Sequence, residues 1–306
     1  MREARVEPDA INYNAALSAC ETGEQWRRAL SLFSDMREAK FELDVISYSA
    51  GISACEKSEQ WQRALSLLRE MREALVEADV ISYNAGISAC EKRGQWQRAT
   101  ALLGEMREAK MECNIISYNA GISACEKGRQ WQHALSLLGE VRGARLEPNV
   151  ISCTAGVSAC GNSGQWQRAL SLLGEVVTAR FELDATCCNA GISACEKGEQ
   201  WQQALSLLGE MREVKLEPSV VSFNAGISAC AKCMEWRRAL ALLSDMREAK
   251  FEPDVTSYSA SISACEKGGQ WQPALLLLSQ MRETKMEPNA TSFTLPDTLR
   301  ASASRL

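Results

Sequence analysis

The side chains that could do catalytic or metal chemistry are few in this sequence. The chain of 306 residues has a single histidine, His133, so a histidine-based catalytic triad or a multi-histidine metal site is untenable. Cys230-Ala231-Lys232-Cys233 is a lone C-x-x-C motif without the second pair that a four-ligand zinc site needs. We therefore expect no metal, no cofactor, no small-molecule substrate and no catalysis.

Side chains suited to hydrogen bonding instead recur every 35 residues, in two rows. The first row is Asn14, Ser49, Asn84, Asn119, Thr154, Asn189, Asn224 and Ser259. The second row is Asp44, Asp79, Asn114, Asn149, Asp184, Ser219, Asp254 and Asn289. Amides, hydroxyls and carboxylates of this kind donate and accept hydrogen bonds, so this is the chemistry that the rows offer.

The same period governs the whole chain. The eight tryptophans, from Trp26 to Trp271, stand at intervals of 35, and eight of the 13 cysteines keep the same interval. A repeat of 20–50 residues indicates a solenoid or a propeller. The units are 10–44, 45–79, 80–114, 115–149, 150–184, 185–219, 220–254 and 255–289. We expect residues 1–9 to end a preceding unit and residues 290–306 to be a partial unit and tail, as in a piece of a longer array.

Each unit has the pattern of two helices. In 45–79, one apolar stripe at helical spacing is Tyr48, Gly51, Ile52 and Cys55, and a second is Trp61, Ala64, Leu65, Leu68 and Met71. No stretch alternates with period two, which excludes a propeller. The sequence thus predicts an all-α solenoid of helix-turn-helix repeats, in which the tryptophans pack between second helices and mid-helix glycines allow close helix approach.

The composition of the chain limits the classes of partner that we expect it to bind. With 34 Lys+Arg against 39 Asp+Glu, the net charge of −5 argues against indiscriminate binding of polyanions. No run approaches the length of a membrane span, so we expect no membrane partner. The start lacks the apolar stretch of a secretory signal, and the odd number of cysteines favours a reducing compartment.

The segment Val-Ile-Ser-Tyr-Ser-Ala-Gly-Ile-Ser-Ala-Cys-Glu-Lys (45–57), with Ala64-Leu65 and closings such as Glu252-Pro253-Asp254, resembles the pentatricopeptide repeat. The resemblance covers residues 1–295, as an array of about eight repeats of the P type, and implies a right-handed α-solenoid. The tetratricopeptide repeat, which binds peptides, is a weaker match because its period is 34 and its tryptophan lies in the first helix.

The resemblance implies binding of single-stranded RNA at one base per repeat. The first row above is the fifth place of each unit and the second row is the last place, and the family reads bases at these two places. By the family's code, the target is U-G-Y-Y-G-C-U-A, where Y is C or U. A simpler interpretation of the last place is also open: Asp, Asn and Ser are the best N-caps, and the next helix starts there.

Two further rows take a role from the resemblance. The second places, which would sandwich bases, are Ile11, Ile46, Ile81, Ile116, Ile151 and Val221, with Thr186 and Thr256 as departures. The thirteenth places, which would bind phosphate, are Lys57, Lys92, Lys127, Lys197, Lys232 and Lys267. Packing at the helix start could equally explain the second places, and a favourable helix C-terminus could equally explain the lysines.

The resemblance also implies a role in RNA processing, stabilisation or translation in a mitochondrion or chloroplast, although no transit peptide is visible. The alternative is a protein-interaction scaffold without RNA specificity, with protein partners in the same groove.

Overall fold

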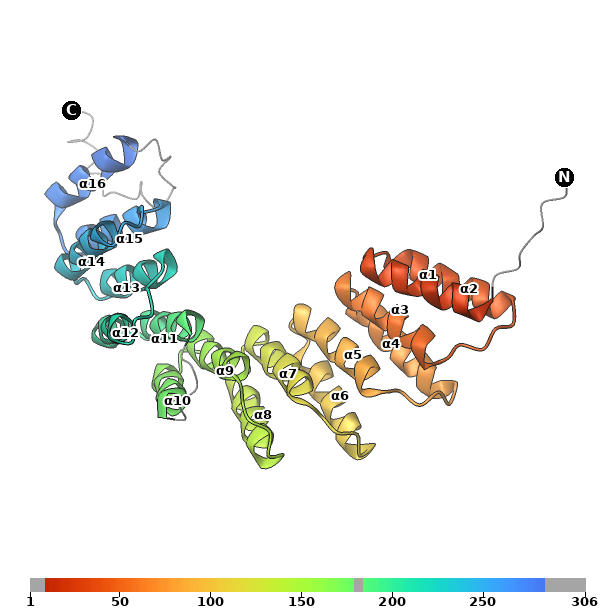
Figure 1. Cartoon of the computed structure of the whole chain (residues 1–306). Helices are drawn as coiled ribbons and strands as arrows, with labels where there is room; N and C mark the ends of the chain where they lie inside the picture. The colour runs from red at the N-terminus through yellow and green to blue at the C-terminus, as the bar shows by residue number, and fades with distance from the viewer. Residues whose placement is uncertain (1–8, 179–183, 284–306) are drawn as a thin grey trace. The chain divides into compact units, whose positions relative to one another are not determined.

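The computed structural model describes residues 9–178 and 184–283. In these residues the chain forms sixteen α-helices and no strand, which confirms the predicted all-α fold of paired helices (Figure 1). The helices are α1 Ala10–Thr22, α2 Trp26–Glu38, α3 Val45–Lys57, α4 Trp61–Glu73, α5 Val80–Lys92, α6 Trp96–Glu108, α7 Ile115–Lys127, α8 Trp131–Gly143, α9 Val150–Asn162, α10 Trp166–Thr178, α11 Ala185–Lys197, α12 Trp201–Glu213, α13 Val220–Lys232, α14 Trp236–Glu248, α15 Val255–Lys267 and α16 Trp271–Glu283. The expected tails, apart from Asp9, lie outside the described residues.

The ends of each helix follow from local hydrogen bonds. Helix α3 begins after Asp44, whose carboxylate accepts a hydrogen bond from the Ser47 backbone N–H at 2.8 Å. It ends in a turn in which Glu59 has a φ of 58° and the Gln60 N–H donates to the Cys55 carbonyl at 2.8 Å. This short turn leads directly into α4, so the two helices of a pair are tied together by backbone bonds.

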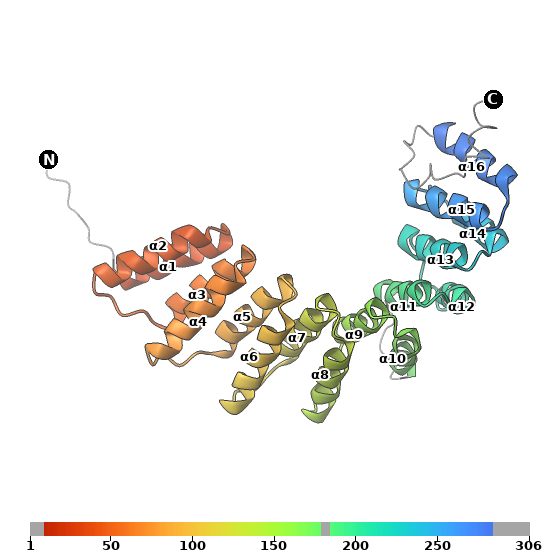
Figure 2. The ribbon, with the colours of Figure 1, turned by 180° about the vertical axis from the view of Figure 1, so that it is seen from behind.

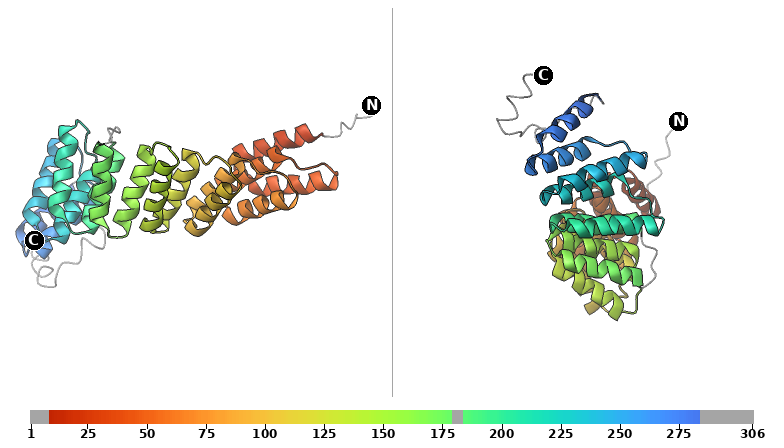
Figure 3. Two further views of the ribbon diagram at one scale, coloured as in Figure 1. Left: turned by 90° about the horizontal axis from the view of Figure 1, so that it is seen from below. Right: turned by 90° about the vertical axis from the view of Figure 1, so that its left-hand side faces the viewer.

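The chain divides into two compact units, Met1–Ala159 and Cys160–Leu306. In the first, α1, α3, α5 and α7 pack in succession, and α2, α4 and α6 each contact both their own partner and the next odd-numbered helix (Figures 1 and 2). In the second, α11, α13 and α15 lie side by side in the same manner, with α10, α12 and α14 against them (Figure 3). In each of the two compact units, the odd-numbered helices therefore form one layer against which the even-numbered helices pack.

The core lies between these two kinds of helix. In α3 and α4 the side chains of Ile52, Leu68 and Met71 are 1% exposed or less, as the predicted stripes require. Leu65 was predicted in the core and is only half-buried, whereas Leu67 is 3% exposed. The difference arises because α4 packs on two odd-numbered helices, so its buried face turns toward both and leaves Leu65 at the edge.

Trp96, Trp166 and Trp236 pack against the following repeat. The Trp96 ring lies 4.6 Å from the His133 ring of α8, centroid to centroid. A methyl group added at Gly128, in the turn after α7, would lie 2.4 Å from the Trp96 ring. Trp96 thus covers both the turn and the second helix of its neighbour, which is the packing role predicted for this row. No helix among the described residues has the length and apolarity to cross a bilayer.

The mid-helix glycines accept side chains from the preceding second helix. A Cβ at Gly51 of α3 would lie 2.4 Å from the Phe33 ring of α2, and one at Gly121 of α7 would lie 2.5 Å from Leu103. The close approach predicted from sequence is therefore real, but it is made by a large side chain seated over the glycine.

The substitution Gly51→Ala should destabilise the fold by about 1–3 kcal/mol, because the Phe33 ring has to move. Gly104→Ala in α6 is the matched control: a Cβ there meets nothing within 4 Å, so the variant should gain about 0.5–1 kcal/mol from helix propensity. Urea unfolding followed by circular dichroism measures both changes. Equal effects of the two variants would contradict the role given to Gly51.

Candidate nucleic-acid interface

The two hydrogen-bonding rows predicted from sequence meet in space. The side-chain amide of Asn224 in α13 donates to the two carboxylate oxygens of Asp254 at 3.1 and 3.3 Å. Asn119 donates to Asn149 Oδ1 at 3.2 Å. The same contact is longer between Asn14 and Asp44, at 3.4 and 3.5 Å, and between Asn189 and Ser219, at 3.5 Å. The fifth and last places of these repeats therefore form adjacent pairs of polar groups.

A third residue, which was not predicted from the sequence, completes each pair. Ser257, the third residue of α15, donates its hydroxyl to Asn224 Oδ1 at 2.5 Å and to Asp254 Oδ1 at 2.9 Å. The corresponding bonds to the preceding fifth place are Ser47 to Asn14 at 2.7 Å, Ser117 to Asn84 at 2.6 Å, Ser152 to Asn119 at 2.6 Å and Ser222 to Asn189 at 2.5 Å. These serines are 0% exposed. Their signal in the sequence was a serine at the same 35-residue interval.

The serine determines which way the amide faces. Because Ser257 donates to Asn224 Oδ1, the amide nitrogen is the atom left to face Asp254 and solvent. The pair then offers one remaining N–H from the amide and lone pairs of the carboxylate. These are a donor and an acceptor side by side, which is what the edge of a base can bind.

The last-place residues also cap the following helices, which confirms the simpler interpretation of that row. Asp44, Asp79, Asn114, Asn149, Asp184, Ser219 and Asp254 each accept a hydrogen bond from the backbone N–H three residues on. The contact with the fifth place is additional to this cap. Asn289 lies outside the described residues.

The second and fifth units depart from the common pattern. Ser49 shares a hydrogen bond with Ser82 and donates to the Val45 carbonyl, so its hydroxyl is partly used within its own helix. The hydroxyl of Thr154 is buried and has no hydrogen-bond partner among the described residues. At the third place of the sixth unit Cys187 replaces serine, and the Asp184 carboxylate accepts a hydrogen bond from the Cys187 backbone N–H.

The second-place side chains are exposed, so the alternative that they pack at the helix start is wrong. Ile11, Ile46, Ile81, Ile116, Ile151 and Val221 are 61–76% exposed. Thr186 and Thr256 are exposed as well. Apolar side chains repeated at one place and left in solvent suggest a surface that contacts another molecule.

The thirteenth-place lysines are mostly ion-paired. Lys57, Lys92, Lys127 and Lys232 each contact a glutamate of the preceding repeat, at 3.1, 2.7, 2.8 and 3.2 Å respectively. Lys197 donates to the Asn162 side chain. Lys267 is exposed, and the structure shows no ion pair for it among the described residues. These glutamate partners, which stand 36 residues before each lysine, were not predicted from the sequence.

Ten of the 13 cysteines are buried and act as small core residues. None forms a disulfide. Burial raises the pKa of the Cys125 thiol to about 12 and that of Cys55 to about 11, so both stay protonated at neutral pH. Cys230 is buried, and the Cys233 thiol donates to the Glu199 carbonyl. In the described ranges no three His, Cys, Asp or Glu side chains gather in a way that could hold a metal.

The caps make stability depend on pH in the acid range. Burial alone would raise the pKa of Asp44, but hydrogen bonds from Ser47 and Asn14 outweigh it and hold the pKa below the usual 3.8. The pKa of Asp254 is lowered in the same way by Ser257 and Asn224. A carboxyl whose pKa is lower in the folded state adds stability that is fully present above the unfolded value and is lost as the pH falls through the folded value.

We therefore expect the double variant Asp44→Asn/Asp254→Asn to lose less stability than the unsubstituted protein between pH 5 and pH 3. Asparagine keeps the cap but cannot be protonated in this range. Thermal melting at half-unit pH steps measures the effect, and Asp35→Asn, at an exposed residue of α2, is the control. Identical pH profiles for the double variant and the unsubstituted protein would contradict it.

Comparisons with known proteins identify the repeat and the fold. The model of the pentatricopeptide repeat domain matches residues 31–93, 66–128, 101–163 and 171–233. Models of the PPR repeat match residues 11–41, and of the PPR repeat family 218–267. A search of curated protein sequences gave no match.

Solved structures share the fold. The chain resembles the crystal structure of the pentatricopeptide repeat protein PPR10 from maize at 22% identity and a TM-score of 0.54, over 95% of this chain and 46% of that one. It also resembles the PPR domain of Arabidopsis thaliana protein-only RNase P 1, solved in complex with tRNA, at 11% identity and a TM-score of 0.52, over 59% and 95% respectively. The chain thus spans about half the length of the maize protein. With family models matching more than half of its residues, the chain belongs to the pentatricopeptide repeat family.

Proposed function

We propose that this protein binds single-stranded RNA and reads one base per repeat through the fifth and last places. The observation that carries the proposal is the pairing of those two places, as in Asn224 and Asp254, with a buried serine that orients the amide. The PPR domain of Arabidopsis protein-only RNase P 1 was solved with tRNA, which supports RNA as the class of ligand.

The orientation of the side chains supports uracil at the Asn–Asp pairs. The amide of Asn224 has an N–H left to donate, and the carboxylate of Asp254 accepts. Uracil offers the complement, a carbonyl oxygen beside an imino N–H. A carboxylate in this place repels the unprotonated ring nitrogen of cytosine, so uracil is preferred.

At the Asn–Asn pairs the chemistry changes. Asn149 Oδ1 already accepts hydrogen bonds from Asn119, from the Ser152 backbone and from its hydroxyl. The amide nitrogen of Asn149 is then the group that faces outward, and the pair is a double donor. Cytosine and uracil both present acceptors that satisfy donors, which fits the looser reading of a pyrimidine.

The exposed second-place side chains contact the flat faces of the bases, so that each base lies between two of them. Ile81 and Ile116 follow one another in α5 and α7 at 64% and 63% exposure. A base between two such side chains removes apolar surface from water, at about 25 cal/mol per Å². Thr186 and Thr256 offer less apolar surface, so the sixth and eighth repeats bind their bases more weakly.

The eight repeats then read U-G-Y-Y-G-C-U-A from the N-terminus as 5′ to 3′. The array itself is non-catalytic and acts by occupying an RNA segment. We place it, as most of its family, in a mitochondrion or chloroplast, in RNA processing, stabilisation or translation.

The proposal is tested by fluorescence anisotropy of labelled U-G-U-C-G-C-U-A beside a permuted RNA of the same composition. Binding of the predicted RNA should be tighter by tenfold or more, which is about 1.4 kcal/mol. Equal, weak binding of both would overturn the proposal and direct attention to protein partners of a scaffold.

A single substitution should change the letter read by the seventh repeat. Asn224→Ser leaves a Ser–Asp pair, which by the family's code prefers G to U. The variant should therefore bind U-G-U-C-G-C-G-A more tightly than U-G-U-C-G-C-U-A, with about a tenfold reversal of preference. Unchanged preference for U at the seventh nucleotide would show that Asn224 does not read the base.

A further inference from the structure

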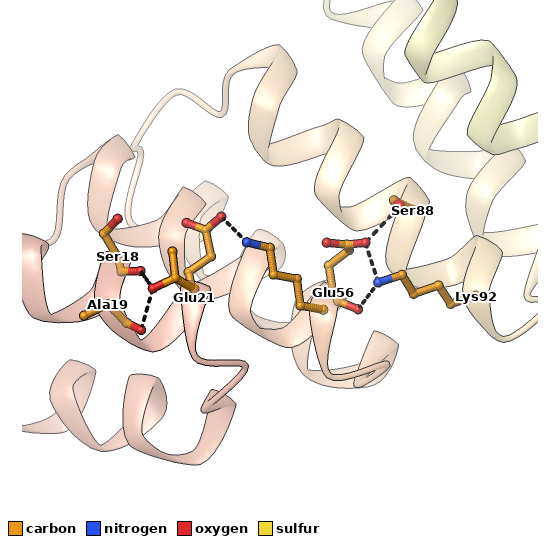
Figure 4. A network of polar contacts seen from close by, with 8 residues as sticks. Ser18, Ala19, Glu21, Glu56, Ser88 and Lys92 are labelled. Atoms are coloured by element: carbon orange, nitrogen blue, oxygen red, sulfur yellow. Dashed lines mark hydrogen bonds and ion pairs between the residues drawn. The ribbon is translucent and has the colours of Figure 1, made fainter.

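The thirteenth-place lysines could bind an anion, but four of them are ion-paired with glutamates. The twelfth place of a repeat lies beside the thirteenth place of the next, so Glu21 pairs with Lys57 at 3.1 Å and Glu56 with Lys92 at 2.7 Å (Figure 4). Glu56 is further held by the Ser88 hydroxyl at 3.1 Å. Glu91 pairs with Lys127 at 2.8 Å, and Glu196 with Lys232 at 3.2 Å.

Two lysines lack such an ion pair because the twelfth place of the preceding repeat is not a glutamate. The twelfth place before Lys197 is Gly161, and the one before Lys267 is Ala231. Both lysines are exposed. Lys197 has only the neutral Asn162 side chain as partner, and Lys267 has no ion pair in the part of the chain that the structure describes. Both lysines lie in the second of the two compact units, Cys160–Leu306.

A glutamate on a lysine competes with a phosphate for the same charge. Where the ion pair exists, a phosphate has to displace a carboxylate that then takes up its own counterion, so little is gained and little salt dependence results. Where the glutamate is missing, the phosphate contacts a free ammonium group and releases a counterion. The number of unpaired lysines, and not the number of lysines, sets the electrostatic part of binding.

We propose that the twelfth-place glutamates determine RNA affinity by neutralising the phosphate-binding row, so that Lys197 and Lys267 are its main phosphate contacts. This inference rests on the proposed function. It assigns the role of weakening non-specific binding to Glu21, Glu56, Glu91 and Glu196, and it leaves base reading to the polar pairs.

The test is the triple variant Glu21→Gln/Glu56→Gln/Glu91→Gln, measured by anisotropy with the predicted and the permuted RNA at several salt concentrations. Freeing three lysines should tighten binding of both RNAs by about tenfold. At about 0.7 per phosphate, the slope of log K against log salt should steepen from about −1.4 for two contacts to about −3.5 for five.

The control is Glu38→Gln/Glu77→Gln/Glu108→Gln, which removes the same charge from exposed residues that form no ion pair within the described ranges. It corrects for the change in net charge from −5 to −2. Affinity and slope that change equally in the two triple variants would overturn the inference.

The converse change uses Lys267. Ala231→Glu supplies the missing partner, so it should weaken binding and flatten the slope by as much as Lys267→Gln does. If Ala231→Glu binds RNA as the unsubstituted protein does, while its circular dichroism spectrum is unchanged, the inference fails.

Failure of the proposed function gives a different result. If the predicted and permuted RNAs bind alike but the glutamate variants still tighten both, base reading fails and the role of the glutamates stands. If the predicted RNA is preferred but the glutamate variants bind no more tightly, reading stands and the glutamate inference is overturned.

Discussion

The hydrogen bond that starts each odd-numbered helix is the interaction on which the other features depend. Asp254 accepts the Ser257 N–H at 2.8 Å, which fixes where α15 begins and so which residues of α15 face α13. The same carboxylate faces Asn224. Helix initiation, packing of neighbours and the polar pair therefore share one side chain, and a substitution there alters all three together.

Periodicity made the fold accessible from sequence because each helix repeats its apolar stripe at the same spacing. The core positions Ile52 and Met71 follow from it directly. The position of Leu65 could not, because a helix that contacts two neighbours has a buried face wider than one stripe, and its centre depends on how the helices are turned. The exposure of Ile46 and Ile81 was likewise undecided until the neighbouring helices were placed.

Polar contacts between residues close in the sequence could be predicted from it, whereas those between distant residues could not. The cap at Asp44 joins residues three apart and could be predicted, whereas the contact of Ser47 with Asn14 spans 33 residues. The same holds for Glu56 and Lys92, 36 residues apart. In a repetitive chain both partners recur in every unit, so their interval reveals that they repeat but not which copy touches which.

The turns after the odd-numbered helices have a consequence for how the chain opens. Glu24, Glu59, Arg129, Glu199 and Met234 hold a left-handed φ of 55–62°, whereas Gly94, Gly164 and Gly269 fill the same place in three repeats. A side chain in that conformation stores strain of about 1–2 kcal/mol that glycine does not. The backbone amides beside Glu59 and Arg129 should thus exchange with solvent deuterium sooner than those beside Gly94. The free energy of local unfolding then differs from repeat to repeat, although the repeats have nearly the same sequence.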